Sequence, residues 1–274
     1  MKFLESLILG FVSGLTEFLP ISSAAHRQII CAVFGTDASD PARNLFIHIA
    51  IFLAAYINTA KKRERLDRAY KNQSGYMKKG SPTGSAVMEY RLLRLAVISF
   101  MIVFLLLYYL IPVQANLFSV SICLLVNGLI IYWPDRMMQG NKNAKVMSAF
   151  ESILLGIAGA LCVFPGFSRI GFMFSIATLC GAERRSSVNW ALLLSLWALG
   201  ALVLTDLLAL FSEGGAPFWS NFIYYIITAF FSFIGACAGL HILRKSISKK
   251  GCAGFSYYCW GAAIFALIIF LTVS

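Results

Sequence analysis

The sequence predicts an all-α polytopic membrane protein that is built as an inverted-topology repeat. Of its 274 residues, 59% are hydrophobic and 13% are charged, whereas about a quarter of a soluble domain is charged. Residues 5–15 read ESLILGFVSGL, and residues 151–161 read ESILLGIAGAL. Each run leads to a proline and a polar stretch. Broken apolar helices at matching places in two halves are typical of membrane proteins with a repeat and a site at mid-membrane depth.

Basic residues are concentrated in a few segments, which orient the chain in the membrane. The net charge is +11, and ten of the 23 Lys and Arg residues lie between positions 61 and 94. Further groups lie at 136–145, 184–185 and 244–250. Because basic loops mark the cytoplasmic side, we interpret this charge as topological and expect no nucleic-acid partner. Four basic residues lie outside these groups, namely Lys2, Arg27, Arg43 and Arg169.

Apolar runs of about 20 residues, the length that crosses a bilayer, predict six spanning helices. They lie near 44–60, 92–111, 117–134, 189–211, 219–243 and 255–273. Two further segments, 3–35 and 148–181, combine an apolar run with a polar or mixed stretch and predict re-entrant hairpins. Residues 1–274 then form a single membrane domain. Its first repeat is 1–134 and its second is 148–274, each a hairpin followed by three helices.

The charge pattern also predicts the orientation of the two halves. With the basic loops inside, the loop at 61–91 is cytoplasmic and the turn at Ser212–Asn221 is external. We therefore expect Ser74 and Lys249 in the cytoplasm and Gly215 outside. Three spans in each half turn the second half upside down, so the two hairpins enter from opposite sides and their tips meet near mid-membrane.

Glu17 is the only carboxylate deep in the first hairpin. An ionisable residue inside a membrane segment is costly and is usually functional. Ser22, Ser23 and His26 follow it, beside the break at Pro20. A carboxylate can bind a divalent cation or act as a base, and a hydroxyl can be a nucleophile when a base is in reach. The structural alternative for Glu17 is a helix cap or an arginine pair.

The second hairpin carries PGFSR at 165–169, in the position that corresponds to the first break. A helix that restarts after Pro and Gly presents free N–H groups to an anion. Arg169 offers a guanidinium that can bind phosphate with two hydrogen bonds. Arg169 could also pair with Glu17, and the two roles are compatible.

Three other ionisable residues lie in apolar segments. His48, in the first predicted span, either forms a hydrogen bond between helices or lines the site. Glu151 and Asp206 lie near predicted helix ends, and we expect them to be interfacial.

These motifs resemble the undecaprenyl-diphosphate phosphatases, the bacitracin-resistance family. SGLTEFLPISSAAH at 13–26 resembles the first signature of that family, and FPGFSRIG at 164–171 resembles the second. The likeness continues in order along nearly the full chain. It implies an enzyme of the bacterial cell membrane with inverted repeats and re-entrant helices. Such an enzyme removes the terminal phosphate of a polyprenyl diphosphate at the outer face, with Mg or Ca, and recycles the lipid carrier for cell-wall synthesis.

The resemblance also implies roles for individual residues. The catalytic set carried over is Glu17, Ser23, His26, Ser168 and Arg169. The phosphate-binding set is Ser22, Gly166, Ser168 and Arg169, and Glu17 is the candidate metal ligand. The expected partners are the lipid substrate and the bilayer, and a homodimer is one alternative for the oligomeric state.

Several positions depart from the family pattern, including the following three. Ser13 stands where a first acid is expected, Ile170 replaces a Ser, and Met173 replaces a Thr. Because a second carboxylate is missing, we predict a slow phosphatase that needs high divalent cation. The alternative is a non-hydrolytic polyprenyl-phosphate transporter or flippase on the same fold, and an ion-coupled solute transporter is a third. Released phosphate separates the enzyme from the other two.

Overall fold

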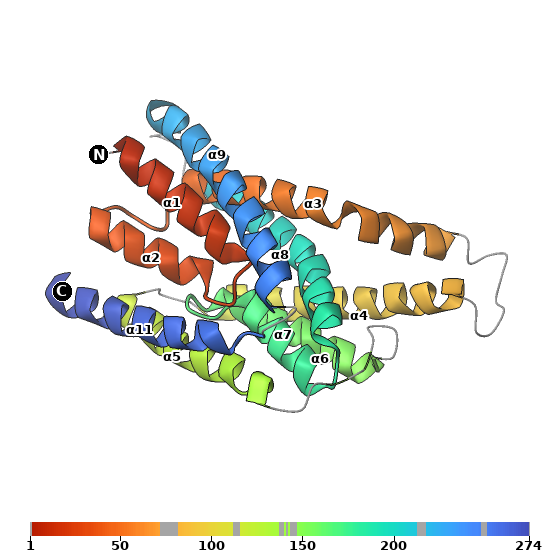
Figure 1. Ribbon diagram of the computed structural model, residues 1–274. Helices are drawn as coiled ribbons and strands as arrows, with labels where there is room; N and C mark the ends of the chain where they lie inside the picture. The colour runs from red at the N-terminus through yellow and green to blue at the C-terminus, as the bar shows by residue number, and fades with distance from the viewer. Residues whose placement is uncertain are drawn as a thin grey trace.

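The computed structural model describes residues 2–71, 82–111, 116–136, 140, 142, 147–212, 218–247 and 251–273. Apart from an isolated bridge between Lys142 and Ala182, the regular structure of these residues is helical. The longer helices (Figure 1) are α1 (Lys2–Glu17), α2 (Ser23–Phe34), α3 (Pro41–Lys71), α4 (Pro82–Leu110), α5 (Leu117–Tyr132), α6 (Ala149–Ala160), α7 (Arg169–Leu179), α8 (Arg184–Ser212), α9 (Phe218–Ile242) and α11 (Ala253–Val273). Short helical turns are η2 (Pro134–Arg136), η3 (Leu161–Val163) and η4 (Leu243–Ile247).

Five of the described helices are long and apolar enough to cross a membrane, namely α3, α4, α8, α9 and α11. The chain is therefore a multi-pass membrane protein, as its composition predicts. The remaining predicted span, 117–134, corresponds to α5, which ends at Tyr132 shortly before Pro134, a residue without the N–H that would continue the helical hydrogen bonds. With 16 residues, α5 is about 24 Å long at 1.5 Å per residue, shorter than the roughly 30 Å hydrocarbon core. The six predicted spans therefore correspond to five long helices and the shorter α5.

The basic segment at 61–91, expected to be a polar loop, is largely helical. Helix α3 continues to Lys71, and α4 begins at Pro82. Glu89 of α4 is buried and pairs with two basic side chains of α3, Lys62 and Arg65, the latter at 2.9 Å. A buried carboxylate requires such partners. The basic residues therefore join α3 to α4 in addition to marking one end of the molecule.

The two predicted hairpins are present as pairs of short helices, α1–α2 and α6–α7. The chain breaks at 18–22 in the first hairpin and at 161–168 in the second. Figure 1 shows that the hairpins enter the bundle from opposite ends and that their tips meet near its centre. Helix α2 has 12 residues and α7 has 11. Neither is long enough to span a bilayer alone.

Several of the most extensive helix contacts recur when each helix is exchanged for its counterpart in the other half. Helix α1 packs on α9, and their counterparts α6 and α4 pack on each other. The remaining counterparts pack directly together, α3 on α8 and α5 on α11 (Figure 1). This is the pattern that a two-fold related repeat predicts. The division into 1–134 and 148–274 stays a prediction.

Small residues let α1 and α9 approach closely. A Cβ atom added to Gly14 would lie 2.0 Å from the carbonyl oxygen of Ser232, and one added to Gly235 would lie 2.2 Å from that of Phe11. Such contact between backbones is typical of helix pairs in membranes. It fixes α1, and therefore the position of Glu17 at its end.

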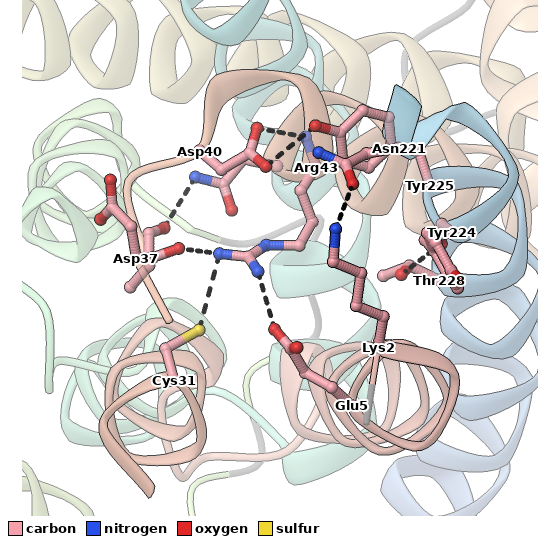
Figure 2. A network of polar contacts seen from close by, with 12 residues as sticks. Lys2, Glu5, Cys31, Asp37, Asp40, Arg43, Asn221, Tyr224, Tyr225 and Thr228 are labelled. Atoms are coloured by element: carbon pink, nitrogen blue, oxygen red, sulfur yellow. Dashed lines mark hydrogen bonds and ion pairs between the residues drawn. The ribbon is translucent and has the colours of Figure 1, made fainter. Parts of the chain in front are cut away.

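The open end of each hairpin is closed by a glutamate that the repeat places in equivalent positions. In the first hairpin, Arg43 contacts Glu5 at 3.2 Å, Cys31 at 3.7 Å and the carbonyl oxygen of Asp37 (Figure 2). In the second, Lys142 contacts Glu151 at 3.0 Å. Glu151 also caps the start of α6, where a helix-terminal position was expected.

Candidate active site

The tips of the two hairpins are hydrogen-bonded to each other. The Gly166 N–H donates to Ser22 Oγ over 3.1 Å. In return, Ser168 Oγ donates to the carbonyl oxygen of Leu19 over 3.1 Å. The motifs that the sequence placed in separate halves therefore form one buried unit.

Asn127 of α5 joins the two tips from the side. Its Nδ2 donates to the carbonyl oxygen of Pro20 at 3.1 Å, and its Oδ1 accepts from the Ser168 N–H at 2.8 Å. The residue is fully buried. Sequence reasoning missed Asn127 because nothing near it in the chain distinguishes it from other polar residues of an apolar helix.

A serine caps the helix that leaves each tip. Ser22 Oγ accepts from the N–H of Ala25 at the start of α2, and Ser168 Oγ accepts from the N–H of Gly171 at the start of α7, at 3.2 Å. The turn into α2 needs a positive φ of 63° at Ser22. Because residues with free N–H groups begin both α2 and α7, two partially positive helix ends face the meeting point of the tips.

Glu17 lies at this meeting point and uses both carboxylate oxygens. Oε1 pairs with Arg169 Nη2, and Oε2 accepts a hydrogen bond from Ser23 Oγ. All three residues are buried. Arg169 Nε has no hydrogen-bond partner among the described residues. The Glu17–Arg169 pair considered from the sequence is present, and the guanidinium keeps a donor for a further acceptor.

A cavity of about 60 Å³ lies beside this pair. Its wall includes Glu17, Ser22, Ser23, Ser168 and Arg169, and Gly166 reaches the same place through its bond to Ser22. A water molecule needs about 10–15 Å³ measured in this way. The cavity therefore has room for a small group and not for a long lipid chain.

His26 is the predicted site residue that lies elsewhere. Its Nδ1 is 2.7 Å from the carbonyl oxygen of Ser22, and its Nε2 is 2.8 Å from the hydroxyl of Tyr258 on α11. The two rings are stacked. In the part of the chain that is described, these ring hydrogen bonds of His26 reach neither Glu17 nor Ser23, so its role as a proton shuttle stays a prediction.

The departures from the family pattern at Ser13, Ile170 and Met173 are buried. Ile170 and Met173 belong to the main hydrophobic core, where they pack with residues such as Phe18. Ser13 is fully buried, and its hydroxyl has no partner among the described residues. None of the three positions lines the cavity.

Arg27, His48 and Asp206 form a chain of contacts that sequence reasoning did not assemble. Arg27 Nη1 is 2.7 Å from His48 Nε2, and His48 Nδ1 is 2.5 Å from Asp206 Oδ2. Arg27 and His48 line the cavity. His48 thus fills both roles considered for it, and Asp206 binds a buried histidine where an interfacial position was expected. One feature of the sequence could have indicated this cluster: Arg27 is a basic residue that lies outside the basic segments.

The described residues do not form a ligand set for a resident divalent cation. Glu17 is the only carboxylate in the cavity wall, and its two oxygens are already used. No group of three His, Cys, Asp or Glu residues suited to a metal occurs in the described part of the chain. Mg²⁺ is usually bound by one or two carboxylates together with substrate phosphates. The prediction of Mg or Ca at Glu17 stays a prediction.

The fold and the site define a multi-pass membrane protein whose two re-entrant hairpins form a small cavity with two arginines in its wall. The family model described as "Bacitracin resistance protein BacA" matches residues 6–265. The chain belongs to this family.

Curated relatives of similar length match the chain from end to end. It is 28% identical to "Undecaprenyl-diphosphatase" of Methanococcus vannielii, over 96% of this chain and 99% of that protein. It is 28% identical to "Undecaprenyl-diphosphatase 1" of Shouchella clausii, over 98% and 96%. It is 26% identical to "Undecaprenyl-diphosphatase" of Prochlorococcus marinus, over 99% of both chains.

Proposed function

We propose that this protein hydrolyses undecaprenyl diphosphate to the monophosphate and phosphate, and so recycles the lipid carrier for cell-wall synthesis. The observation that carries the proposal is the convergence of Glu17, Ser23 and Arg169 on one buried cavity at two helix N-termini. The names of the relatives supply the substrate, since they are undecaprenyl-diphosphatases.

The site suits the charge that phosphoryl transfer develops. Positioning and neutralisation of the phosphoryl oxygens supply most of the catalysis in such reactions. Arg169 can hold two of these oxygens with its planar guanidinium. The N–H groups that begin α2 and α7 add partial positive charge from two directions.

Ser23 is the better placed of the two candidate hydroxyl nucleophiles. Its Oγ donates to Glu17, whereas Ser168 Oγ is engaged with backbone groups on both sides. Ser23 Oγ attacks the terminal phosphorus while its proton passes to Glu17. The bond from that phosphorus to the bridging oxygen breaks, the lipid monophosphate leaves with the electron pair, and water later releases phosphate from the serine. A water molecule activated by Glu17 is the alternative nucleophile and gives the same products.

The proposal places the protein in the bacterial cell membrane with its site open to the outer face. Arg244 of η4 donates to the carbonyl oxygen of Asn58 in α3 at 3.1 Å, so two basic segments lie at one end of the molecule. By the positive-inside rule this end is cytoplasmic, which puts the open end of the first hairpin outside. Ser74, Gly215 and Lys249, which bear the topology prediction, lie outside the described residues.

Phosphate release by the purified protein tests the proposal. Detergent-solubilised protein is given undecaprenyl diphosphate, and inorganic phosphate is measured with and without chelator. Arg94→Gln is the matched control, because Arg94 is an exposed arginine of α4 that lies outside the cavity wall. The proposal predicts release by the native protein and by the control. Movement of labelled polyprenyl phosphate across vesicles without release of phosphate would favour the transporter instead.

A further inference from the structure

We infer that Arg27 is a second guanidinium for the diphosphate head group, and that it supplies the positive charge for which a divalent cation would otherwise be needed. The inference rests on the proposed function. It is specific to the residues of this chain, because it joins an arginine of α2 to a histidine of α3 and an aspartate of α8.

Arg27 reaches the same cavity as the Glu17–Arg169 pair. Arg27 and Arg169 both lie in the wall of the cavity, Arg27 from the second turn of α2 and Arg169 from the start of α7. One carboxylate in the wall, that of Glu17, faces these two guanidinium groups. The wall is therefore cationic before the partial charges of the two helix ends are added.

The hydrogen bonds of His48 orient Arg27 without neutralising it. A guanidinium can only donate, so His48 Nε2 must accept from Arg27, and the ring proton is on Nδ1. That proton is donated to Asp206. The contact that holds Arg27 is thus a neutral imidazole, and the carboxylate of Asp206 lies on the far side of the ring. Among the described residues, Arg27 forms no salt bridge of its own.

A guanidinium held in this way is free to bind an anion. Arg has five N–H donors in a fixed plane, and one of them is used by His48. A purely structural role, joining α2 to α3, would leave this charge in a buried wall without a counter-ion in direct contact, because the nearby carboxylates of Glu17 and Asp206 contact Arg169 and His48 instead. A diphosphate head group would supply that counter-ion.

A divalent cation fits this cavity poorly because of the charges in its wall. Ser13 stands one helical turn before Glu17, where the family pattern has an acid, so the site has one carboxylate less for a metal. Arg27 adds a positive charge to the same cavity. Two guanidinium groups can neutralise the phosphoryl oxygens here, whereas other phosphoryl-transfer enzymes use a metal ion together with a guanidinium group. The native protein should then work without added divalent cation, contrary to the requirement predicted from the missing acid.

Binding of inorganic diphosphate tests Arg27 independently of turnover. Titration calorimetry in the presence of chelator compares the native protein with Arg27→Gln, Arg27→Lys and the control Arg94→Gln. We expect Arg27→Gln to weaken binding roughly 10-fold or more, the scale of one charge-assisted hydrogen bond. Arg27→Lys should recover part of the affinity. Thermal unfolding of each variant shows that it is folded. Equal affinity of folded Arg27→Gln and native protein would overturn the inference.

Phosphate release from undecaprenyl diphosphate then tests whether Arg27 supplies the positive charge in place of a divalent cation. The native protein should keep its rate in chelator, whereas Arg27→Gln should lose at least about 10-fold in kcat/KM and regain part of it in millimolar Mg²⁺. If the native protein loses its activity in chelator, Arg27 does not replace a divalent cation. If the native protein releases no phosphate while diphosphate binding still depends on Arg27, the proposed function fails and the head-group site remains.

Discussion

The two ends of the first hairpin hold polar clusters of opposite charge balance. At the open end (Figure 2), a pocket of about 240 Å³ is lined by three carboxylates and two basic residues, Glu5, Asp37, Asp40, Lys2 and Arg43. At the tip, a cavity of about 60 Å³ has two guanidiniums and one carboxylate. An anionic phosphate is attracted to the tip and repelled by the open end.

The comparison shows that a buried arginine is not by itself a phosphate site. Arg43 is buried as deeply as Glu17, but its Nη1 and Nη2 groups meet acceptors from α1, α2 and the loop between α2 and α3. It therefore fastens three segments together. Arg43 also lines a pocket, and its Nε, like that of Arg169, has no partner among the described residues, but that pocket holds three carboxylates. At the tip, Arg169 has one carboxylate partner and Arg27 one neutral partner, and their cavity is lined by a single carboxylate. The charge around the unpaired N–H donors therefore distinguishes an arginine that binds an anion from one that joins segments of the protein.

The largest expected effect on activity is a difference between variants of the two glutamates of α1. Glu17→Gln removes the group that accepts the Ser23 proton, so kcat/KM for phosphate release should fall roughly 10³-fold, within the range for loss of a general base. Glu5→Gln, at the other end of the same helix, should stay within a few-fold of native activity. Steady-state phosphate release measures both. Similar losses in the two variants would remove the distinction between the two ends.

Removal of Arg43 should affect stability and leave the chemistry intact. Arg43→Gln leaves Glu5 without its buried partner, which costs about 3 kcal/mol or more when such a pair is broken. The unfolding temperature should fall, while kcat per folded molecule changes little. Thermal unfolding in detergent measures the unfolding temperature. Steady-state kinetics, corrected for the fraction of folded protein, measure kcat. A normal unfolding temperature with lost activity would assign Arg43 to the site.

Arg169 should depend on its geometry as well as its charge. Arg169→Lys keeps the positive charge but loses the planar pair of donors. We expect roughly a 10²-fold loss in kcat/KM, the scale of one transition-state donor. Near-native turnover would reduce Arg169 to an ion-pair partner of Glu17.

Ser13→Glu should make the tip resemble the acid-rich open end. Ser13 does not line the cavity, but positions 13 and 17 share a face of α1, so the longer side chain of a glutamate can extend toward Glu17 and offer a second carboxylate to a cation. We expect Mg²⁺ to raise the unfolding temperature of the variant by a few degrees, consistent with stabilisation by a bound ligand. The native protein should not respond. An equal response of both proteins would contradict the charge account of the tip.

Local signatures in the sequence predicted most of the hairpins and of the tip. The repeated run, the prolines and the serines that follow them fix where each helix breaks, and Glu17, Ser23 and Arg169 lie within those signatures. The structure brings these three together, as predicted. His26 lies in the same signature but its ring turns toward Tyr258, because the face that a residue of α2 presents depends on how α2 packs against α11.

Contacts between distant helices could not be predicted in this way. Arg27, His48 and Asp206 come from α2, α3 and α8, and their alignment follows from the packing of α3 on α8. A polar residue in an apolar run signals only that it needs a partner. The helical continuation of α3 to Lys71 was missed for the same reason, since Glu89 supplies its partners from α4.

A structure with inorganic diphosphate bound tests the central claim most directly. The account predicts density for the diphosphate between the starts of α2 and α7, within hydrogen-bond distance of Arg27 and Arg169. Density in the pocket around Arg43, or an empty tip at saturating diphosphate, would contradict it.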